Sequence, residues 1–588
     1  MFCRLRYLPN VKRNLRQRPR LLSWERIQLQ TAKPLDINSV SPPAATSPDV
    51  SDKKQNVIGE MFPTSRVVPM VLSNKEPVVL SFDSVPGPKS LKYLSGFRQY
   101  LTEIGTQLTA GILTMSLSIG NYLSNRKSIK NLSTLFDEYG PVVRFVSPMG
   151  GDIVLINHPA HIQKVYAMEG EVPVRSTLDS LEKYRREHRN HNYGGLFTIQ
   201  GEEWARQREL LYAPVHSSVE QHVTAIYEMC DKFTQKVYNL RNYQDELSKD
   251  LHKELHKWTF DCVGLLMFSK KFTMLDTELV YSQCDMSWMY HSLVKATDAI
   301  VKCESGLHMW KLFTTPAWFS LVKHCDSLDS LIGKYVMETE QELFKAKDEP
   351  NSSNSLISAL LLSEPKMSTE DIATVLMDML LIGVNTISTT VSFLMYYIAK
   401  YQKCQKTLYQ EVGNIYPEHT IEDINNLKAN TPYLQACIKE TLRLVPPIPL
   451  LTRILPRNIT LDSYNIPRGT LIIMSTQDSS LKESNFDDAR RFNPERWLGA
   501  DSGEYHPFAS VPFGHGARRC LGQSWCGWRT CLNLAFVILT WFIFYYIIFS
   551  RLHYNPYKLE YHYGDIQPTR SFIARPNKPI KIRFIDRI

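Results

Sequence analysis

Hydrophobic residues recur at spacings of three and four along most of residues 130–440, which predicts a succession of amphipathic helices. The clearest examples are residues 217–243 and 326–347. Two other stretches, 142–156 and 459–475, are rich in Val, Ile and Thr between Pro and Gly residues, as short β-strands are. The pattern therefore predicts a mainly α-helical fold with small β-sheets.

A long uncharged run, Met379–Ala399, lies inside a predicted helix over residues 368–400. Ser368 opens this helix and Asp371 follows three residues later, which is a capping pair. By hydropathy the run is long enough to span a membrane. Its middle, however, holds polar residues at 385–390, and polar groups at that depth need protein partners or a wet cavity. We therefore expect a long helix buried in a large core.

Composition places the chain among globular proteins. Of its 588 residues, 43% are hydrophobic and 22% are charged, which excludes a disordered, collagen-like or polytopic membrane chain. Eleven cysteines without any Cys-x-x-Cys pair argue against a disulfide scaffold or a structural zinc module. Lys and Arg number 68 against 59 Asp and Glu, which gives a net charge of +9. Where this charge lies along the chain decides which kind of partner it indicates.

Residues 1–35 carry most of that charge, with nine basic residues and one acid, or +8. An Arg-rich, acid-poor and amphipathic start is typical of a mitochondrial transit peptide; a disordered basic arm that binds nucleic acid is the alternative. The other 553 residues carry only +1, so we expect no nucleic-acid partner. The Ser- and Pro-rich residues 36–84 predict a disordered linker, and Val85-Pro86-Gly87-Pro88 marks the start of a single domain over 85–588.

The strongest chemical signal is a glycine-rich loop around Cys520, with the sequence Phe-Gly-His-Gly-Ala-Arg-Arg-Cys-Leu-Gly over residues 513–522. Its glycines let the backbone turn closely around a large planar ligand. Arg518 and Arg519 favour the thiolate form of Cys520, and Arg518 is suited to bind a carboxylate on that ligand. Phe513 can shield the sulfur from water. The alternative is a glycine-rich surface loop with an ordinary buried cysteine.

This loop resembles F-G-x-G-x-R-x-C-x-G, the haem-ligand loop of the cytochrome P450 family, and the resemblance covers roughly residues 86–588. It implies the cytochrome P450 fold, a single large α-rich domain. It also implies that Cys520 is the metal ligand, the axial thiolate of haem b (iron protoporphyrin IX), which pushes electron density onto iron and favours O–O cleavage.

Other segments match the family in the same order. Glu440 and Arg443, in Lys-Glu-Thr-Leu-Arg, and Arg496, in Pro-Glu-Arg, resemble the family's buried structural triad. Trp204 and Arg208 resemble the W-x-x-x-R helix that holds a haem propionate.

A third propionate partner is implied at Arg453, alongside Arg518. Arginine suits that task because its planar fork binds a carboxylate through two hydrogen bonds.

The family's oxygen-handling motif, A-G-x-[DE]-T-T, matches this chain in part. Gly383 and Thr386 are present, whereas Ile382 replaces the small residue and Asn385 replaces the acid. Asn cannot ionise, though it can hold a water molecule by hydrogen bonds. The resemblance implies a monooxygenase in which Thr386, with Asn385 and water, handles protons beside the oxygen space at Gly383. A haem-thiolate isomerase or dehydratase and a non-catalytic haem-binding relic are the alternatives.

The basic leader resembles that of the mitochondrial branch of the family, which implies an adrenodoxin-type [2Fe–2S] ferredoxin, with its reductase, as electron donor. Lys439 keeps one basic position for docking the acidic ferredoxin, whereas Gln435 and Gln523-Ser524 depart from the pattern. The resemblance also implies O₂ and a hydrophobic, steroid-like or xenobiotic substrate. We expect the enzyme to lie peripherally on the matrix side of the inner mitochondrial membrane.

Residues 523–556 do not fit the family, because Thr530–Ser550 is an uncharged run with apolar residues on every side where an amphipathic helix is expected. A membrane span and a wholly buried helix are two interpretations. We favour a third, in which about 25–30 residues are encoded by a mispredicted or retained intron, since AT-rich DNA translates into Phe, Ile, Tyr and Leu.

Overall fold

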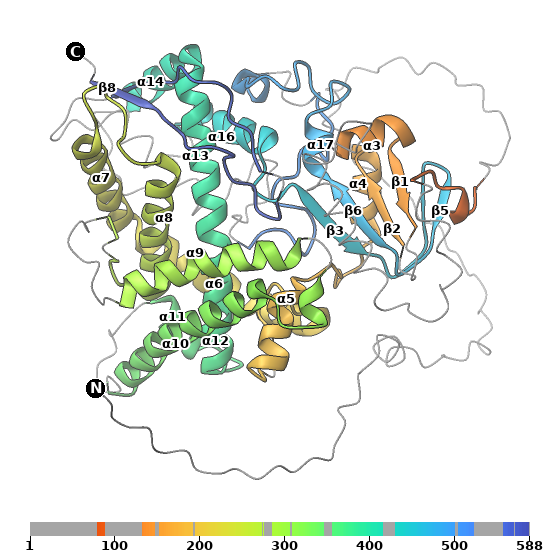
Figure 1. The fold of residues 1–588 in the computed structure, drawn as a ribbon, viewed down its shortest axis with the longest axis horizontal. Coiled ribbons are helices and arrows are strands. Elements are labelled where there is room, and N and C mark those ends of the chain that lie inside the picture. Colours follow the sequence, from red (N-terminus) through yellow and green to blue (C-terminus); the bar gives the residue numbers. More distant parts are fainter. Residues whose placement is uncertain are drawn as a thin grey trace, which may run out of the picture. The chain divides into compact units, whose positions relative to one another are not determined.

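Helices dominate the described part of the chain and gather around the long α13, while the larger sheet lies to one side (Figure 1). The computed structural model describes residues 79–88, 132–146, 152–191, 194–272, 274–275, 285–305, 308–345, 355–415, 430–499, 504–521, 557–569 and 571–586. These belong to the second of two compact units, Met1–Glu76 and Pro77–Ile588. The transit peptide, nearly all of the linker and the stretch 523–556 lie outside the described residues, so those interpretations stay predictions.

The α-helices agree with the expected fold class. They are α3 (Leu132–Tyr139), α4 (Pro159–Ala167), α5 (Asp179–Lys183), α6 (Gly201–Gln221), α7 (Val223–Leu240), α8 (Leu251–Phe268), α9 (Asp285–Glu304), α10 (Pro316–Lys345), α11 (Leu356–Leu361), α12 (Thr369–Asp378), α13 (Asn385–Lys400), α14 (Gln402–Ile415), α16 (Pro432–Leu444) and α17 (Thr476–Ser480). Shorter 3₁₀ and π turns are η1 (Phe82–Ser84), η3 (Tyr184–His188), η4 (Met309–Lys311), η5 (Met379–Val384) and η6 (Pro494–Trp497).

Two helix boundaries differ from the prediction. The expected helix 217–243 is broken at His222, where α6 ends and α7 begins, and the ring Nδ1 of His222 bonds the Ser218 carbonyl at 2.7 Å. The expected helix 326–347 is the second half of α10, which starts at Pro316 because its apolar face continues upstream through Leu321 and Cys325.

Both stretches expected to be strands form strands. The four-stranded sheet has the order β1 (Val142–Phe145), β2 (Ile153–Ile156), β6 (Leu471–Ser475) and β3 (Leu450–Ile454). Strands β2 and β6 run parallel and the other neighbours antiparallel. Two antiparallel pairs complete the sheets: β4 (Ile459–Leu461) with β5 (Tyr464–Ile466), and β7 (Tyr557–Glu560) with β8 (Arg583–Asp586).

The central strands β2 and β6 are apolar except for Ser475, because both faces of the sheet are covered. Alternate residues point to opposite faces. Val154 and Ile472 pack in one core cluster with residues of α4, whereas Ile153 and Leu471 pack in another with residues of α3. The sheet thereby holds β3 rigidly, and β3 carries Arg453.

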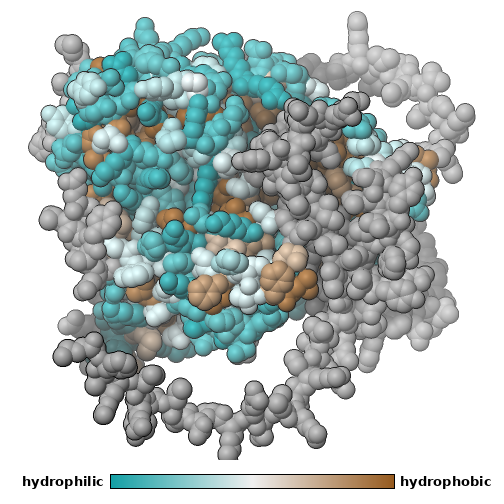
Figure 2. Space-filling model, viewed as in Figure 1, coloured by the Kyte–Doolittle hydropathy of each residue, from teal (hydrophilic) through white to brown (hydrophobic). Residues whose placement is uncertain are grey.

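The expected long helix is present and buried. It runs continuously over Thr369–Lys400, and although it is apolar and long enough to cross a membrane, 78% of its most apolar window is buried inside the protein. The Ser368 side chain caps α12 by accepting a hydrogen bond from the Asp371 N–H at 3.1 Å. The sequence pattern did not indicate the π turn η5 between α12 and α13. The outer face drawn in Figure 2 is mostly hydrophilic, as expected when apolar side chains are gathered in the core.

The compact unit begins earlier than residue 85. The Leu80 N–H donates to the Ser463 carbonyl at 2.8 Å, and the Asn465 N–H donates to the Leu80 carbonyl at 3.0 Å. The end of the expected linker therefore adds a short bridge to the edge of β5.

Candidate active site

The loop before Cys520 is a tight turn that leaves the thiol accessible. Gly514 and Gly516 have φ of +72° and +74°, a left-handed conformation that favours glycine. The Cys520 N–H donates to the Phe513 carbonyl at 3.0 Å and closes the turn. Cys520 is exposed, in contrast to the buried cysteines elsewhere in the described chain. The thiol of Cys520 is thus not buried, and its role as metal ligand stays a prediction.

A cavity of about 1070 Å³ lies against this thiol. It collects candidates from distant parts of the chain, namely Trp204, Arg208, Gly383, Thr386, Arg453, Phe513, Arg518 and Cys520. Much of the remaining lining is aliphatic, including Leu211, Val219, Val263, Leu266 and Ile382. The structure thus brings together all the cofactor-binding candidates and two of the three catalytic candidates.

Arg518 is held in place but keeps unused hydrogen-bonding capacity. Its Nε donates to the Pro173 carbonyl at 2.8 Å and its Nη2 to Gln200 Oε1 at 2.7 Å, while its guanidinium carbon lies 3.9 Å from the centroid of the Trp204 ring. Among the described residues its buried Nη1 has no hydrogen-bond partner. Burial and then Arg175 lower the pKa of Arg518 to about 8. A charged arginine in this position calls for an anion in the cavity.

Arg453 on β3 is tied down by Glu169. Its Nε donates to the Glu169 carboxylate, its Nη1 to the Thr452 carbonyl at 2.8 Å and its Nη2 to the His515 carbonyl at 3.4 Å. A guanidinium has five N–H groups, so two remain for a ligand. Burial raises the pKa of Glu169, and the nearby arginines oppose that effect.

Arg175 also lines the cavity and was not indicated by any motif. It precedes α5 in an irregular segment, and its buried Nε has no hydrogen-bond partner among the described residues. Burial and then Arg453 lower its pKa to about 10. Its side chain meets the cavity only because the chain folds back against β3, where Val174 bridges Ile454; a single Arg between Val and Ser carries no local signal.

Thr386 and Gly383 lie where the long helix faces the cavity. The Thr386 hydroxyl donates to the carbonyls of Ile382 at 2.9 Å and Gly383 at 3.2 Å. A Cβ added at Gly383 would meet no atom within 4 Å, so this turn leaves open space beside the hydroxyl. The arrangement presents a proton-bearing oxygen and a vacant volume side by side.

Asn385 is not brought to the cavity. Its side chain is 2% exposed, does not line the cavity, and bonds Thr297 and Arg575 on the other side of the helix. The water-holding role expected for its amide stays a prediction with no cavity contact behind it.

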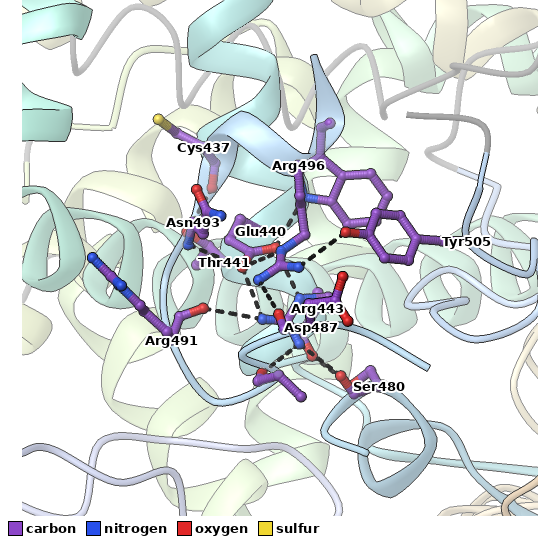
Figure 3. Close-up of polar contacts among 12 residues, drawn as sticks. Cys437, Glu440, Thr441, Arg443, Ser480, Asp487, Arg491, Asn493, Arg496 and Tyr505 are labelled. Carbon is purple, nitrogen blue, oxygen red and sulfur yellow. Dashed lines mark hydrogen bonds and ion pairs between the residues drawn. The ribbon is translucent and has the colours of Figure 1, made fainter. Parts of the chain in front are cut away.

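The expected triad forms one buried network (Figure 3). Glu440 accepts hydrogen bonds from Arg443 Nε and Nη2, both at 2.8 Å, and from Arg496 Nε at 3.1 Å. The Trp497 indole N–H at 2.9 Å and the Asn493 backbone N–H at 3.1 Å complete its partners. Because Arg443 also donates to three backbone carbonyls, those of Ser480, Ala489 and Arg491, the network fastens α16 to the segment that leads to the cysteine loop.

Lys439 precedes Glu440 on α16 and, unlike Glu440, is only half-buried. Burial lowers the pKa of Lys439. Its ammonium is therefore only partly available to an acidic partner.

The site fits a haem. Six arginines line the cavity, among them Arg175, Arg208, Arg453 and Arg518. Glu169 is the buried carboxylate that acts on Arg453 and Arg518, and within the described part of the chain Arg175 and Arg518 carry buried N–H groups without partners. Two propionates would supply the missing acceptors. The accessible thiol of Cys520 at the other end of the cavity suits iron bound through a thiolate.

Comparison with known proteins agrees with this geometry. Residues 112–538 match the family described as Cytochrome P450, and the chain belongs to that family. It is 26% identical over 517 residues to the probable cytochrome P450 301a1, mitochondrial, of Drosophila melanogaster, covering 86% of this chain and 87% of that one. It is 27% identical over 429 residues to the mitochondrial 1,25-dihydroxyvitamin D(3) 24-hydroxylase of Rattus norvegicus, covering 70% and 78%.

The fold is similar to a solved structure, the retinoic acid bound cyanobacterial CYP120A1. The TM-score is 0.61 at 17% sequence identity, over 80% of this chain and 96% of the other. The protein is thus an enzyme of the cytochrome P450 monooxygenase family with the P450 fold, as its cysteine loop indicated.

Proposed function

We propose that this protein is a haem-thiolate monooxygenase that inserts one atom of O₂ into a hydrophobic, steroid-like or xenobiotic substrate. The observation that carries the proposal is the single cavity that joins the accessible thiol of Cys520, the arginines and Thr386. In the overall reaction a C–H bond becomes C–OH, the second oxygen atom leaves as water, and two electrons and two protons are consumed.

Each part of the cavity has a task in that reaction. A haem held by a thiolate supplies the electron density that cleaves the O–O bond. Cys520 would ligate its iron, and Trp204, Arg208, Arg453, Arg518 and Arg175 would hold its propionates. Thr386 holds a proton at its Oγ1 beside the space left by Gly383. The aliphatic lining excludes water and favours a hydrophobic substrate.

The thiolate assignment is tested by the CO spectrum of the reduced protein. We expect a thiolate-type Soret band in the wild type and its loss in Cys520→Ser. Cys437, which is buried on α16, gives a matched control, because Cys437→Ser should keep the band. A wild-type spectrum without that band would contradict the assignment.

The reaction class is tested by supplying ¹⁸O₂. With ferredoxin, its reductase and NADPH we expect one labelled oxygen atom in the product. An isomerase or dehydratase would instead convert a peroxide substrate without ferredoxin and without incorporating label, so the two classes are told apart in one preparation.

For the substrate, we infer a hydrophobic ligand of the steroid or secosteroid class. The cavity of about 1070 Å³ would hold both the haem and the substrate, and its aliphatic lining favours a hydrophobic ligand. A relative is named as a vitamin D hydroxylase, which supports this class. Titrating a panel of sterols, secosteroids and planar xenobiotics against the haem absorption spectrum would identify which class shifts the spin state.

For electron donor and location, we propose an adrenodoxin-type ferredoxin in the mitochondrion, with the enzyme peripheral on the matrix side of the inner membrane. The Arg-rich leader, Lys439 and the mitochondrial names of relatives support this. Exposed apolar side chains between α9 and α10 (Leu312 and Phe313) and near the start of α10 (Phe319) supply a surface for membrane contact. Import into isolated mitochondria followed by carbonate extraction tests the mitochondrial location and the peripheral membrane contact.

A further inference from the structure

Asn385 uses the whole hydrogen-bonding capacity of its amide. Its Nδ2 donates to the Leu381 carbonyl at 2.8 Å and to Thr297 Oγ1 at 3.2 Å. Its Oδ1 lies 3.0 Å from Arg575 Nη2, which donates to it, and 3.4 Å from His256 Nε2. A carboxamide offers two N–H groups and two lone pairs, so none is left to hold a water molecule for proton transfer.

The neighbours of this amide allow one orientation. Arg575 can only donate and the Leu381 carbonyl can only accept, so exchanging the amide oxygen and nitrogen would break both bonds. Burial and then Arg575 lower the pKa of His256 to about 4, which keeps its ring neutral. Neutral His256 donates from Nε2 to Asn385 while its Nδ1, 3.2 Å from the Tyr290 hydroxyl, accepts.

The same amide braces the π turn η5. In a π turn the backbone bonds are shifted and some carbonyls need other donors. The Asn385 amide donates to the Leu381 carbonyl, and the Thr386 hydroxyl donates to the carbonyls of Ile382 and Gly383. The Ile382 carbonyl also accepts the backbone N–H of Asn385. Two adjacent side chains thus hold the wide turn that lines the cavity, one from the outside and one from the cavity side.

Arg575 is anchored independently of Asn385. Its Nη1 donates to Asp298 at 2.7 Å, and its backbone pairs with Thr569, whose N–H donates to the Arg575 carbonyl at 2.7 Å. Thr569 itself lines the cavity. Arg575 therefore connects α9, the C-terminal segment and the long helix.

We propose that Asn385 is a positioning residue and that Arg575 fixes its orientation. Residue 385 is kept out of the cavity whether it is an amide or a carboxylate, because a carboxylate there would bind Arg575 more strongly still. Thr386 is then the side chain of this motif that meets the reacting groups. This inference rests on the proposed monooxygenase function, because it concerns proton transfer during turnover. The contacts from which it is argued do not depend on that function.

The first test compares Asn385→Asp with Asn385→Asp/Arg575→Met, measuring product formed per electron consumed across pH. For Asn385→Asp alone, we expect the curve of product per electron against pH to show no new pH-dependent limb, because Arg575 holds the carboxylate ionised and away from the cavity. The double variant should gain one, since a buried carboxylate without its cation has a raised pKa. A new limb or improved coupling in Asn385→Asp alone would overturn the proposal.

The second test needs no turnover and separates this inference from the proposed function. Hydrogen exchange of the holoenzyme should be about tenfold to a hundredfold faster over residues 379–385 in Arg575→Met, because a charge-assisted bond to the brace is lost. Arg575→Lys should be intermediate. Lys578→Met is the matched control: Lys578 is exposed in the same segment and donates to the Gly564 carbonyl, so its loss should leave η5 unchanged. Equal exchange in Arg575→Met and Lys578→Met would refute the brace.

Discussion

Replacing Glu440 by Gln should destabilise this protein far more than the same change on its surface. Glu440 is 0% exposed and is the carboxylate partner of two buried arginines, Arg443 and Arg496, through three charge-assisted hydrogen bonds. Gln keeps the volume but removes the charge and turns an N–H group toward other N–H groups. Breaking a buried ion pair from one side costs about 3–5 kcal/mol, because the partner charge stays buried without compensation.

This free energy converts into a measurable shift of the unfolding temperature. An unfolding entropy of about 2.1 cal/mol/K per residue over roughly 500 residues is about 1 kcal/mol/K, so Tm should fall by about 3–5 °C. The assay is thermal unfolding of the haem-loaded protein, followed by circular dichroism at one scan rate, since a chain of this size is expected to unfold irreversibly.

Glu338→Gln is the control for this prediction. Glu338 pairs with Lys270 at 3.3 Å, and both side chains are at least 40% exposed, so the pair contributes about 1 kcal/mol or less. If Glu440→Gln lowered Tm by no more than Glu338→Gln, the reasoning from buried charge would be refuted.

Two further predictions concern backbone strain and pH. Gly516→Ala should lower haem content per protein, because a φ of +74° is strained for Ala by about 1–2 kcal/mol and the new Cβ would overlap Glu169. Gly499→Ala is the control, since Gly499 has a φ of +82° but free space around it, and the variant therefore shares only the strain. Equal haem content in the two variants would contradict the clash with Glu169. Burial raises the pKa of Glu304 from 4.5 to about 7. An acid that binds its proton more tightly in the folded state makes stability fall as pH rises from about 4.5 through about 7. Tm measured against pH should therefore fall more steeply in this window for the wild type than for Glu304→Gln, and parallel curves would contradict it.

The sequence was most informative where chemistry is local. The cysteine loop combines two left-handed glycines, neighbouring arginines and one thiol within ten residues, and each feature is visible in the order of the residues. The long helix could be predicted equally well, because its capping pair and its uncharged run are properties of one segment. Family membership followed from these segments and was confirmed by comparison.

Features that depend on contacts between distant segments could not be predicted from the sequence. Arg175 faces the cavity because the segment before α5 bridges β3, and Glu169 reaches Arg453 across almost three hundred residues. The π turn η5 could not be foreseen, since the carbonyls of Leu381, Ile382 and Gly383 accept hydrogen bonds from side chains whose rotamers are set by packing.

The difference between what the sequence determines and what the tertiary structure determines is clearest at Asn385. The sequence alone determined that the family's acid is replaced by an amide and that a threonine follows in register. Only the tertiary structure decided which way that amide points, because Thr297, His256 and Arg575 come from three other segments and, together with the Leu381 carbonyl of its own helix, occupy every hydrogen-bonding position it has. Residue type limits the bonds a side chain can make, and the packing of remote elements selects among them.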